Sequence, residues 1–139
     1  MSAVVYSTTV TAVGELVPDF AEQGVLVFFG ENAPTELHEF SIIHVPDVQT
    51  RAPQVGDTIT LANNEYNVLA VGSVASDNLL NLGHLDLKAN GLTEPEMPGD
   101  VNVEATVLPT VKIGDRLIVI SHPEKRAHGV LLNSFTRAR

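Results

Sequence analysis

The chain has 139 residues, of which 44% are hydrophobic and none is cysteine. This length and apolar content suit one domain with a buried core. The lack of cysteine excludes disulfides and cysteine-based zinc sites or nucleophiles, and it favours a reducing compartment. Residues 1–115 hold 16 acidic and 3 basic residues, a net −13, whereas residues 116–139 hold 5 basic and 1 acidic, a net +4. Because the acidic body would repel a phosphate backbone, we expect no nucleic-acid binding.

The chain shows no signal for export or for a membrane span. Its start, MSAVVYSTTV, lacks the cationic segment followed by an apolar core that a signal peptide requires. No apolar stretch approaches the roughly 20 residues that a membrane helix needs. We therefore expect a cytoplasmic protein.

Short β-strands dominate the pattern along the chain. In chain order, the predicted elements are a strand at 4–13, a helical turn at 17–23, strands at 25–29 and 39–45, a hairpin at 55–74 with its loop at 62–64, a helix at 76–83 capped by Ser76 or Asp77 and ended by Gly83, and strands at 84–89, 100–108 and 115–121. Many short strands separated by turns indicate a sandwich or a barrel, and closure into a barrel removes exposed edges. We predict an all-β fold, a single compact β-barrel with one or two short helices.

The chain divides at residue 121 by composition. Residues 1–121 form the predicted barrel domain. Residues 122–139, HPEKRAHGVLLNSFTRAR, are basic and have a proline as their second residue. Chain ends fray unless they are tied down, so this segment is predicted to be a flexible tail or a docking segment. His122 and His128 lie in it and are expected to face solvent.

Several common sites are missing from the sequence. No glycine-rich phosphate loop is present, and the stretch GSVAS is not a nucleophile elbow. The histidines show no close metal-ligand spacing, so no metal and no cofactor are predicted. A metal site assembled from His38, His44 and His84 on distant strands is a weaker alternative.

The stretch EFSIIHVPD, residues 39–47, places His44 after an apolar run and before Pro46. Proline cannot donate to a ladder, so pairing should weaken there and His44 should lie near a strand end. Strand alternation would put Phe40 and Ile42 on the face that His44 occupies. The residues alone leave three interpretations open, namely a packed structural ring, a metal ligand, or a nucleophile that reaches solvent.

A neutral imidazole is suited to accepting a phosphoryl group and passing it on. An ordinary histidine has a pKa of about 6.5 and is mostly uncharged at pH 7, and burial favours the neutral form further. One ring nitrogen would attack while the other needs a partner that fixes tautomer and orientation. Phosphoryl transfer also needs donors to the equatorial oxygens, for which Ser41, Ser73 and Ser76 are candidates by residue type.

Two stretches together resemble a known family. AVGSVASDNLLNLGHLDLKANGL, residues 70–92, and EFSIIH, residues 39–44, are similar to the glucitol/sorbitol-specific enzyme IIA of the bacterial phosphoenolpyruvate-dependent sugar phosphotransferase system. Shorter blocks at 4–14, 25–34 and 98–105 fit the same pattern in order. The resemblance covers residues 4–120, and the basic tail beyond about residue 121 has no counterpart in it.

The resemblance implies a small β-barrel that carries a phosphoryl group. It would take the group from the histidine-containing phosphocarrier protein and pass it to the IIB unit of a glucitol/sorbitol permease. Contact with the membrane would then be peripheral, through the IIB and IIC units of that permease. An acidic body would steer a basic partner toward the protein. A homodimer is left open.

The resemblance also assigns residues. By its position in EFSIIH, His44 would be the phosphorylated nucleophile. His84, in LGHLDL, would orient His44 or contact phosphate, the alternative being a structural ring at the helix end. Backbone N–H groups around Ser73 and Ser76 would bind phosphate at a helix N-terminus, the alternative being ordinary capping. The alternative function is a non-catalytic β-barrel module that binds a ligand or regulates another protein.

Overall fold

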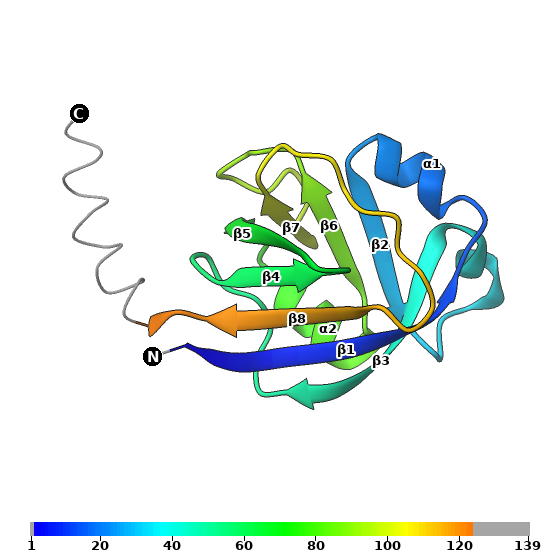
Figure 1. The fold of residues 1–139 in the computed structure, drawn as a ribbon, viewed down its shortest axis with the longest axis horizontal. Coiled ribbons are helices and arrows are strands. Elements are labelled where there is room, and N and C mark those ends of the chain that lie inside the picture. Colours follow the sequence, from blue (N-terminus) through cyan, green and yellow to red (C-terminus); the bar gives the residue numbers. More distant parts are fainter. Residues whose placement is uncertain (1, 124–139) are drawn as a thin grey trace.

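The computed structural model describes residues 2–123, which form a closed barrel (Figure 1). Its eight strands are β1 (Ala3–Val13), β2 (Val25–Gly30), β3 (Ser41–Gln49), β4 (Thr58–Leu61), β5 (Asn64–Val71), β6 (Leu85–Ala89), β7 (Asp100–Val103) and β8 (Arg116–Ser121). They pair in the order β1-β3-β2-β6-β7-β5-β4-β8, and β8 closes the ring by pairing with β1. Only two of these pairs, β2 with β3 and β6 with β7, are parallel. The predicted β-barrel is confirmed.

Three short helical elements accompany the described strands. They are α1 (Val17–Glu22), the 3₁₀ helix η1 (Thr35–Phe40) and α2 (Ala75–Leu82). The predicted helical turn at 17–23 and the helix end at Gly83 are confirmed, since Gly83 has the left-handed φ of 67°. The predicted cap of α2 is wrong, because Val74 is its N-cap and no side chain bonds the free N–H groups.

Strand β3 differs from the prediction at both ends. Glu39 and Phe40 belong to η1, where Phe40 stacks on Phe20, so Phe40 does not share a face with His44. The strand also runs through Pro46 to Gln49. Pairing between β2 and β3 ends at Gly30 and His44, so beyond that point β1 is the only described strand that pairs with β3. Pro46 is tolerated there because β2 no longer pairs with that edge of β3, so the edge needs no backbone N–H donor.

Strand β7 is shorter than the predicted strand at 100–108. Its pairing with β5 stops at Val103, which lies opposite Val68. The next residue, Glu104, accepts the backbone N–H of Asn67 at 2.7 Å and its side-chain amide at 2.7 Å. The Glu104 carboxylate thereby occupies the Asn67 N–H, which a longer β7 would have bonded through its backbone. The pairing of β5 with β7 ends at this point.

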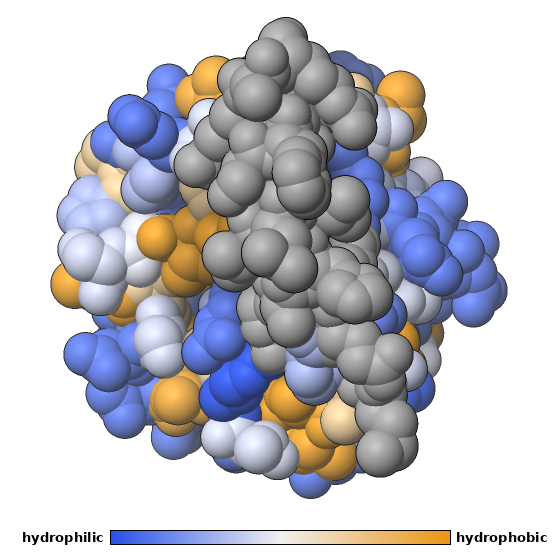
Figure 2. Space-filling model, turned by 90° about the vertical axis from the view of Figure 1, so that its left-hand side faces the viewer, coloured by the Kyte–Doolittle hydropathy of each residue, from blue (hydrophilic) through white to orange (hydrophobic). Residues whose placement is uncertain are grey.

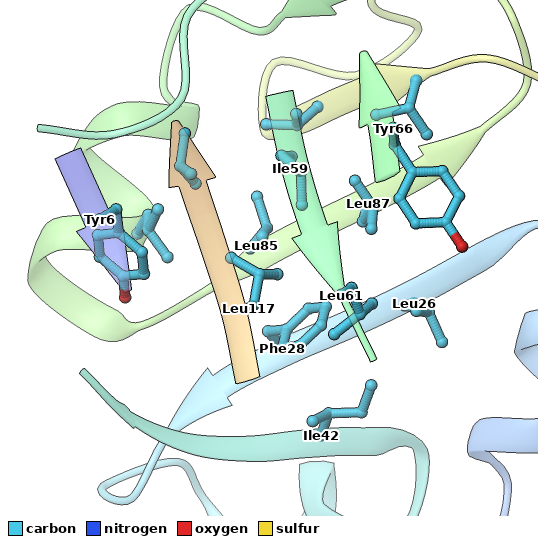
Figure 3. Close-up of a cluster of buried hydrophobic side chains, with 14 of the residues drawn as sticks. Tyr6, Leu26, Phe28, Ile42, Ile59, Leu61, Tyr66, Leu85, Leu87 and Leu117 are labelled. Atoms are coloured by element: carbon cyan, nitrogen blue, oxygen red, sulfur yellow. The ribbon is translucent and has the colours of Figure 1, made fainter. Parts of the chain in front are cut away.

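The barrel interior is filled by large apolar side chains from nearly every strand (Figure 3). Completely covered members include Tyr6, Leu26, Phe28, Ile42, Ile59, Leu61, Leu87 and Leu117. Burying one such side chain stabilises the fold by about 1.5–3 kcal/mol. The core therefore holds the strands rigidly, including the segment of β3 that carries His44.

Tyr6 is a polar exception in this core. Its hydroxyl is buried, has no hydrogen-bond partner among the described residues, and burial raises its pKa to about 12. An unpartnered buried hydroxyl costs free energy, so we expect Tyr6→Phe to raise the free energy of unfolding by about 1 kcal/mol at pH 7. Urea denaturation would measure the change, and a destabilised variant would contradict it.

The same substitution should change the response to alkali. The unfolded tyrosine ionises near pH 10, whereas the folded one holds its proton to about pH 12. The free energy of unfolding of the wild type should therefore be unaffected by Tyr6 ionisation below pH 10. It should fall by about 2–3 kcal/mol as the pH rises from 10 through 12. Tyr6→Phe should lack this loss, and identical alkaline unfolding curves for the two proteins would contradict the assignment.

The surface shown in Figure 2 mixes residue types. On its coloured part, hydrophobic residues lie in small separate groups among hydrophilic ones. His122 is half-buried and its Nε2 lies 2.9 Å from the Thr58 hydroxyl, so its predicted exposure is wrong. His128 and the rest of the basic segment from residue 124 lie outside the described residues, and the division at residue 121 stays a prediction.

Candidate functional site

His44 lies in β3, between Val10 of β1 and Gly30 of β2. The residue is only 1% exposed, and its ring makes a T-shaped contact with Phe28 at a centroid distance of 5.7 Å and an angle of 88°. The expectation that the ring reaches solvent is therefore wrong for this conformation. Because the strand continues to Gln49, His44 is held from both sides instead of standing at a free end.

Both ring nitrogens of His44 have partners. Nε2 lies 2.7 Å from the Gly83 carbonyl oxygen, and Nδ1 lies 2.5 Å from the Thr8 hydroxyl. A carbonyl only accepts, so Nε2 must carry the proton and donate to Gly83. Nδ1 then holds a lone pair and accepts from Thr8. The contacts therefore select a single tautomer of the neutral ring.

The environment of His44 also sets its charge. Burial lowers the pKa of His44, and the hydrogen bond to the Gly83 backbone opposes this shift without cancelling it. The ring is therefore uncharged at pH 7, as the sequence predicted. An uncharged ring has a lone pair on one nitrogen, which a phosphoryl acceptor requires.

Gly83 is where α2 meets the end of β2. A Cβ on this residue would lie 2.6 Å from the Gly30 nitrogen and 3.2 Å from His44 Nε2. Its φ of 67° is left-handed, which glycine adopts without cost. Both facts explain why residue 83 must be glycine if its carbonyl is to contact the His44 imidazole.

An open cavity of about 680 Å³ lies beside His44. It is bounded by the segment after β2, by the C-terminal half of α2 and by β3, and its lining includes the polar residues Glu31, Asn32, Gln49 and Asn81. Exposed apolar residues of the same lining are Val45, Leu80 and Leu82, at 40%, 39% and 57% exposure. His44 and Gly83 thus form part of the wall of a cavity that a second molecule can enter.

His84 is adjacent in sequence to Gly83 but faces elsewhere. Its ring stacks on Phe29 at a centroid distance of 4.3 Å, and Nε2 lies 3.0 Å from Asp86 Oδ1. Its side chain is 22% exposed, and it is not among the residues that line the cavity. His44 thus contacts the Gly83 carbonyl and His84 follows Gly83 in the chain, but no described contact joins the two rings.

Ser73 and Ser76 lie at the other end of α2. Both are exposed near the start of this eight-residue helix, whereas His44 contacts Gly83 after its end. Eight residues of α-helix rise about 12 Å. No described hydrogen bond joins either serine to the His44 cavity, so the structure does not bring these predicted residues together.

Thr8 is the site residue that the sequence did not reveal. It lies 36 residues from His44, within an alternating strand where a threonine is ordinary. Only the pairing of β1 with β3 brings it to Nδ1. Within residues 2–123 no group of three His, Cys, Asp or Glu side chains could hold a metal ion, so the metal alternative at His38, His44 and His84 gains no support.

The chain is similar to known proteins over most of its length. Residues 5–118 match the model of the family described as "PTS system glucitol/sorbitol-specific IIA component". The chain is 41% identical over 104 residues to the glucitol/sorbitol-specific EIIA components of Shigella flexneri and Escherichia coli K12, covering 75% of this chain and 85% of each relative.

A solved structure supports the fold independently. The crystal structure of a PTS system IIA component from Enterococcus faecalis V583 superimposes with a TM-score of 0.69 at 24% identity, over 80% of this chain and 96% of that chain. No helix within residues 2–123 is long and apolar enough to cross a membrane. On the family match and the two relatives, the chain belongs to the glucitol/sorbitol-specific IIA components of the PTS, phosphotransferase components that act as phosphoryl carriers in sugar uptake.

Proposed function

We propose that His44 carries the phosphoryl group, on Nε2. The observation that supports this most is that His44 lines the cavity together with Gly83, whose carbonyl is the described hydrogen-bond partner of Nε2. Nδ1 instead points to the buried hydroxyl of Thr8. Of the two nitrogens, Nε2 is the one that an entering phosphoryl donor could reach.

Attack requires a change from the conformation described above. Nε2 bonded to Gly83 carries a proton and has no free lone pair, so the resting ring is held inactive. Docking of the donor displaces the Gly83 carbonyl, and the ring adopts the tautomer with its proton on Nδ1. The Nε2 lone pair then forms the N–P bond as the donor's P–N bond breaks. The donor nitrogen keeps that electron pair and gains a proton, and the His44 ring loses the proton from Nδ1.

The partners follow from the family and from the lining of the cavity. We propose that the donor is the histidine-containing phosphocarrier protein and the acceptor the IIB unit of a glucitol/sorbitol permease, whose IIC unit lies in the membrane. Exposed Val45, Leu80 and Leu82 offer an apolar rim around the cavity. The acidic body would steer a basic partner there and raise the association rate. These roles belong in the cytoplasm, whereas a homodimer has no structural support of its own.

The roles of the other predicted residues differ in support. His84 remains a candidate for contact with phosphate, because it adjoins Gly83 and stacks on Phe29, which lines the cavity. Ser73 and Ser76 remain predictions on residue type alone. The alternative is that the buried His44 ring is structural, in which case another histidine would receive the phosphoryl group.

Mapping the phosphoryl group would decide between these assignments. The full chain is incubated with phosphoenolpyruvate, enzyme I and the phosphocarrier protein, then digested at alkaline pH and sequenced by tandem mass spectrometry. We expect one acid-labile phosphoryl group per chain, on the peptide that contains His44. A phosphoryl group on His84 or elsewhere would overturn the assignment to His44.

A further inference from the structure

Thr8 and His44 form a buried pair of polar side chains inside the barrel wall. The Thr8 hydroxyl lies 2.5 Å from Nδ1, and each residue is 1% exposed. The register of β1 against β3 is irregular between Ser7 and Thr8, which places Thr8 opposite Pro46. This local irregularity shifts the threonine relative to a regular ladder, and the hydroxyl comes to lie against the imidazole.

We propose that Thr8 is the positioning residue that keeps Nδ1 of the His44 ring hydrogen-bonded in both tautomers, so that the proton can pass from Nε2 to Nδ1 before attack. The proposal rests on the function proposed for His44 above. A hydroxyl both donates and accepts hydrogen bonds. It can donate to bare Nδ1 while Nε2 is bonded to Gly83, and it can rotate to accept from Nδ1–H while Nε2 attacks phosphorus.

This dual capacity separates Thr8 from the other groups around the ring. The Gly83 carbonyl can only accept, and the Phe28 ring offers no lone pair. A buried nitrogen left without a partner costs free energy, so each tautomer needs a partner at Nδ1. Among the described contacts of His44, only Thr8 serves both tautomers.

Thr11 provides a matched control in the same strand. Its hydroxyl donates to the carbonyl of Ile43, the residue before His44, at 3.3 Å. Thr11→Val therefore removes a hydroxyl from the same pair of strands and leaves both ring nitrogens untouched. Thr8→Ser keeps the hydroxyl that matters and removes only a methyl group.

The test compares Thr8→Val, Thr8→Ser and Thr11→Val in the full chain. The rate of phosphoryl transfer from the phosphocarrier protein should fall about 10–100-fold in Thr8→Val, the size of effect known for losing a group that orients a metal-bound histidine. Thr8→Ser and Thr11→Val should stay within a few-fold of the wild type. Equal rates in Thr8→Val and Thr11→Val would overturn the proposal.

A spectroscopic measurement tests the role of Thr8 in the absence of phosphoryl transfer. In ¹⁵N NMR spectra of the unphosphorylated wild type, His44 should show a bare Nδ1 and a protonated Nε2, and Thr8→Val should shift the Nδ1 resonance whereas Thr11→Val should not. A protonated Nδ1 in the wild type would overturn the proposal even if Thr8→Val fails to fold. Phosphoryl mapping to another histidine would instead refute the role of His44, so the two failures are distinguishable.

Discussion

His44→Gln is expected to abolish phosphoryl transfer. The glutamine side-chain amide can still donate to the Gly83 carbonyl, which His44 Nε2 bonds at 2.7 Å, so the local structure should survive. An amide nitrogen has no available lone pair and cannot form the N–P bond. Removing a covalent nucleophile typically lowers a rate by more than about 1,000-fold. The measurement is the initial rate of acid-labile phosphate uptake from the phosphocarrier protein.

His84→Gln and His38→Gln are the matched controls for this experiment. His84 lies 3.0 Å from Asp86 and His38 lies 3.0 Å from the Ala33 carbonyl, so each ring has one described hydrogen bond that a glutamine amide could also make. His38→Gln should transfer at the wild-type rate. His84→Gln should slow transfer without abolishing it if that ring contacts phosphate. Undiminished labelling of His44→Gln, with labelling lost in His84→Gln, would move the covalent site to His84.

Gly83→Ala should cost about 2–4 kcal/mol of the free energy of unfolding. A left-handed φ costs a residue with a Cβ about 1 kcal/mol. The new methyl group would also lie 2.6 Å from the Gly30 nitrogen and 2.8 Å from its Cα, and overpacking against such atoms costs about 1–3 kcal/mol more. Because both atoms belong to the backbone of β2, neither can rotate away. Urea denaturation with a fixed m-value would measure the loss.

Gly114→Ala separates the two parts of that cost. Gly114 has a φ of 93°, and a Cβ built on it would meet nothing within 4 Å. This variant should therefore lose only the conformational part, about 1 kcal/mol. If Gly83→Ala were no less stable than Gly114→Ala, the close packing of α2 against the end of β2 would be wrong.

The local pattern of the sequence predicted much of the fold. Alternation in VVYSTTVTAV gave strand β1, and Gly83 marked the end of α2. The order of the strands could not be predicted, because it depends on contacts between distant segments such as β1 with β8. The strand through Pro46 was missed for the same reason. A proline predicts the end of a strand unless it is known that β3 has one described pairing partner, β1, beyond His44.

The candidate site was predictable only in part. The resemblance of EFSIIH to a family motif singled out His44, and elementary physics gave its neutral ring. Its two hydrogen bonds were not predictable, since Thr8 lies 36 residues away and Gly83 lies 39 residues away in the other direction. Ser73 and Ser76 were chosen by residue type near a helix start. The structure shows that the opposite end of that helix meets the histidine.

The position of β8 between β1 and β4 has a consequence for synthesis. The strand that closes the ring is also the last described strand to leave the ribosome, so a nascent chain shorter than about residue 121 keeps two open ladder edges. Open edges invite pairing with other chains. During translation this protein should therefore depend on chaperones or on rapid completion until Ser121 has emerged.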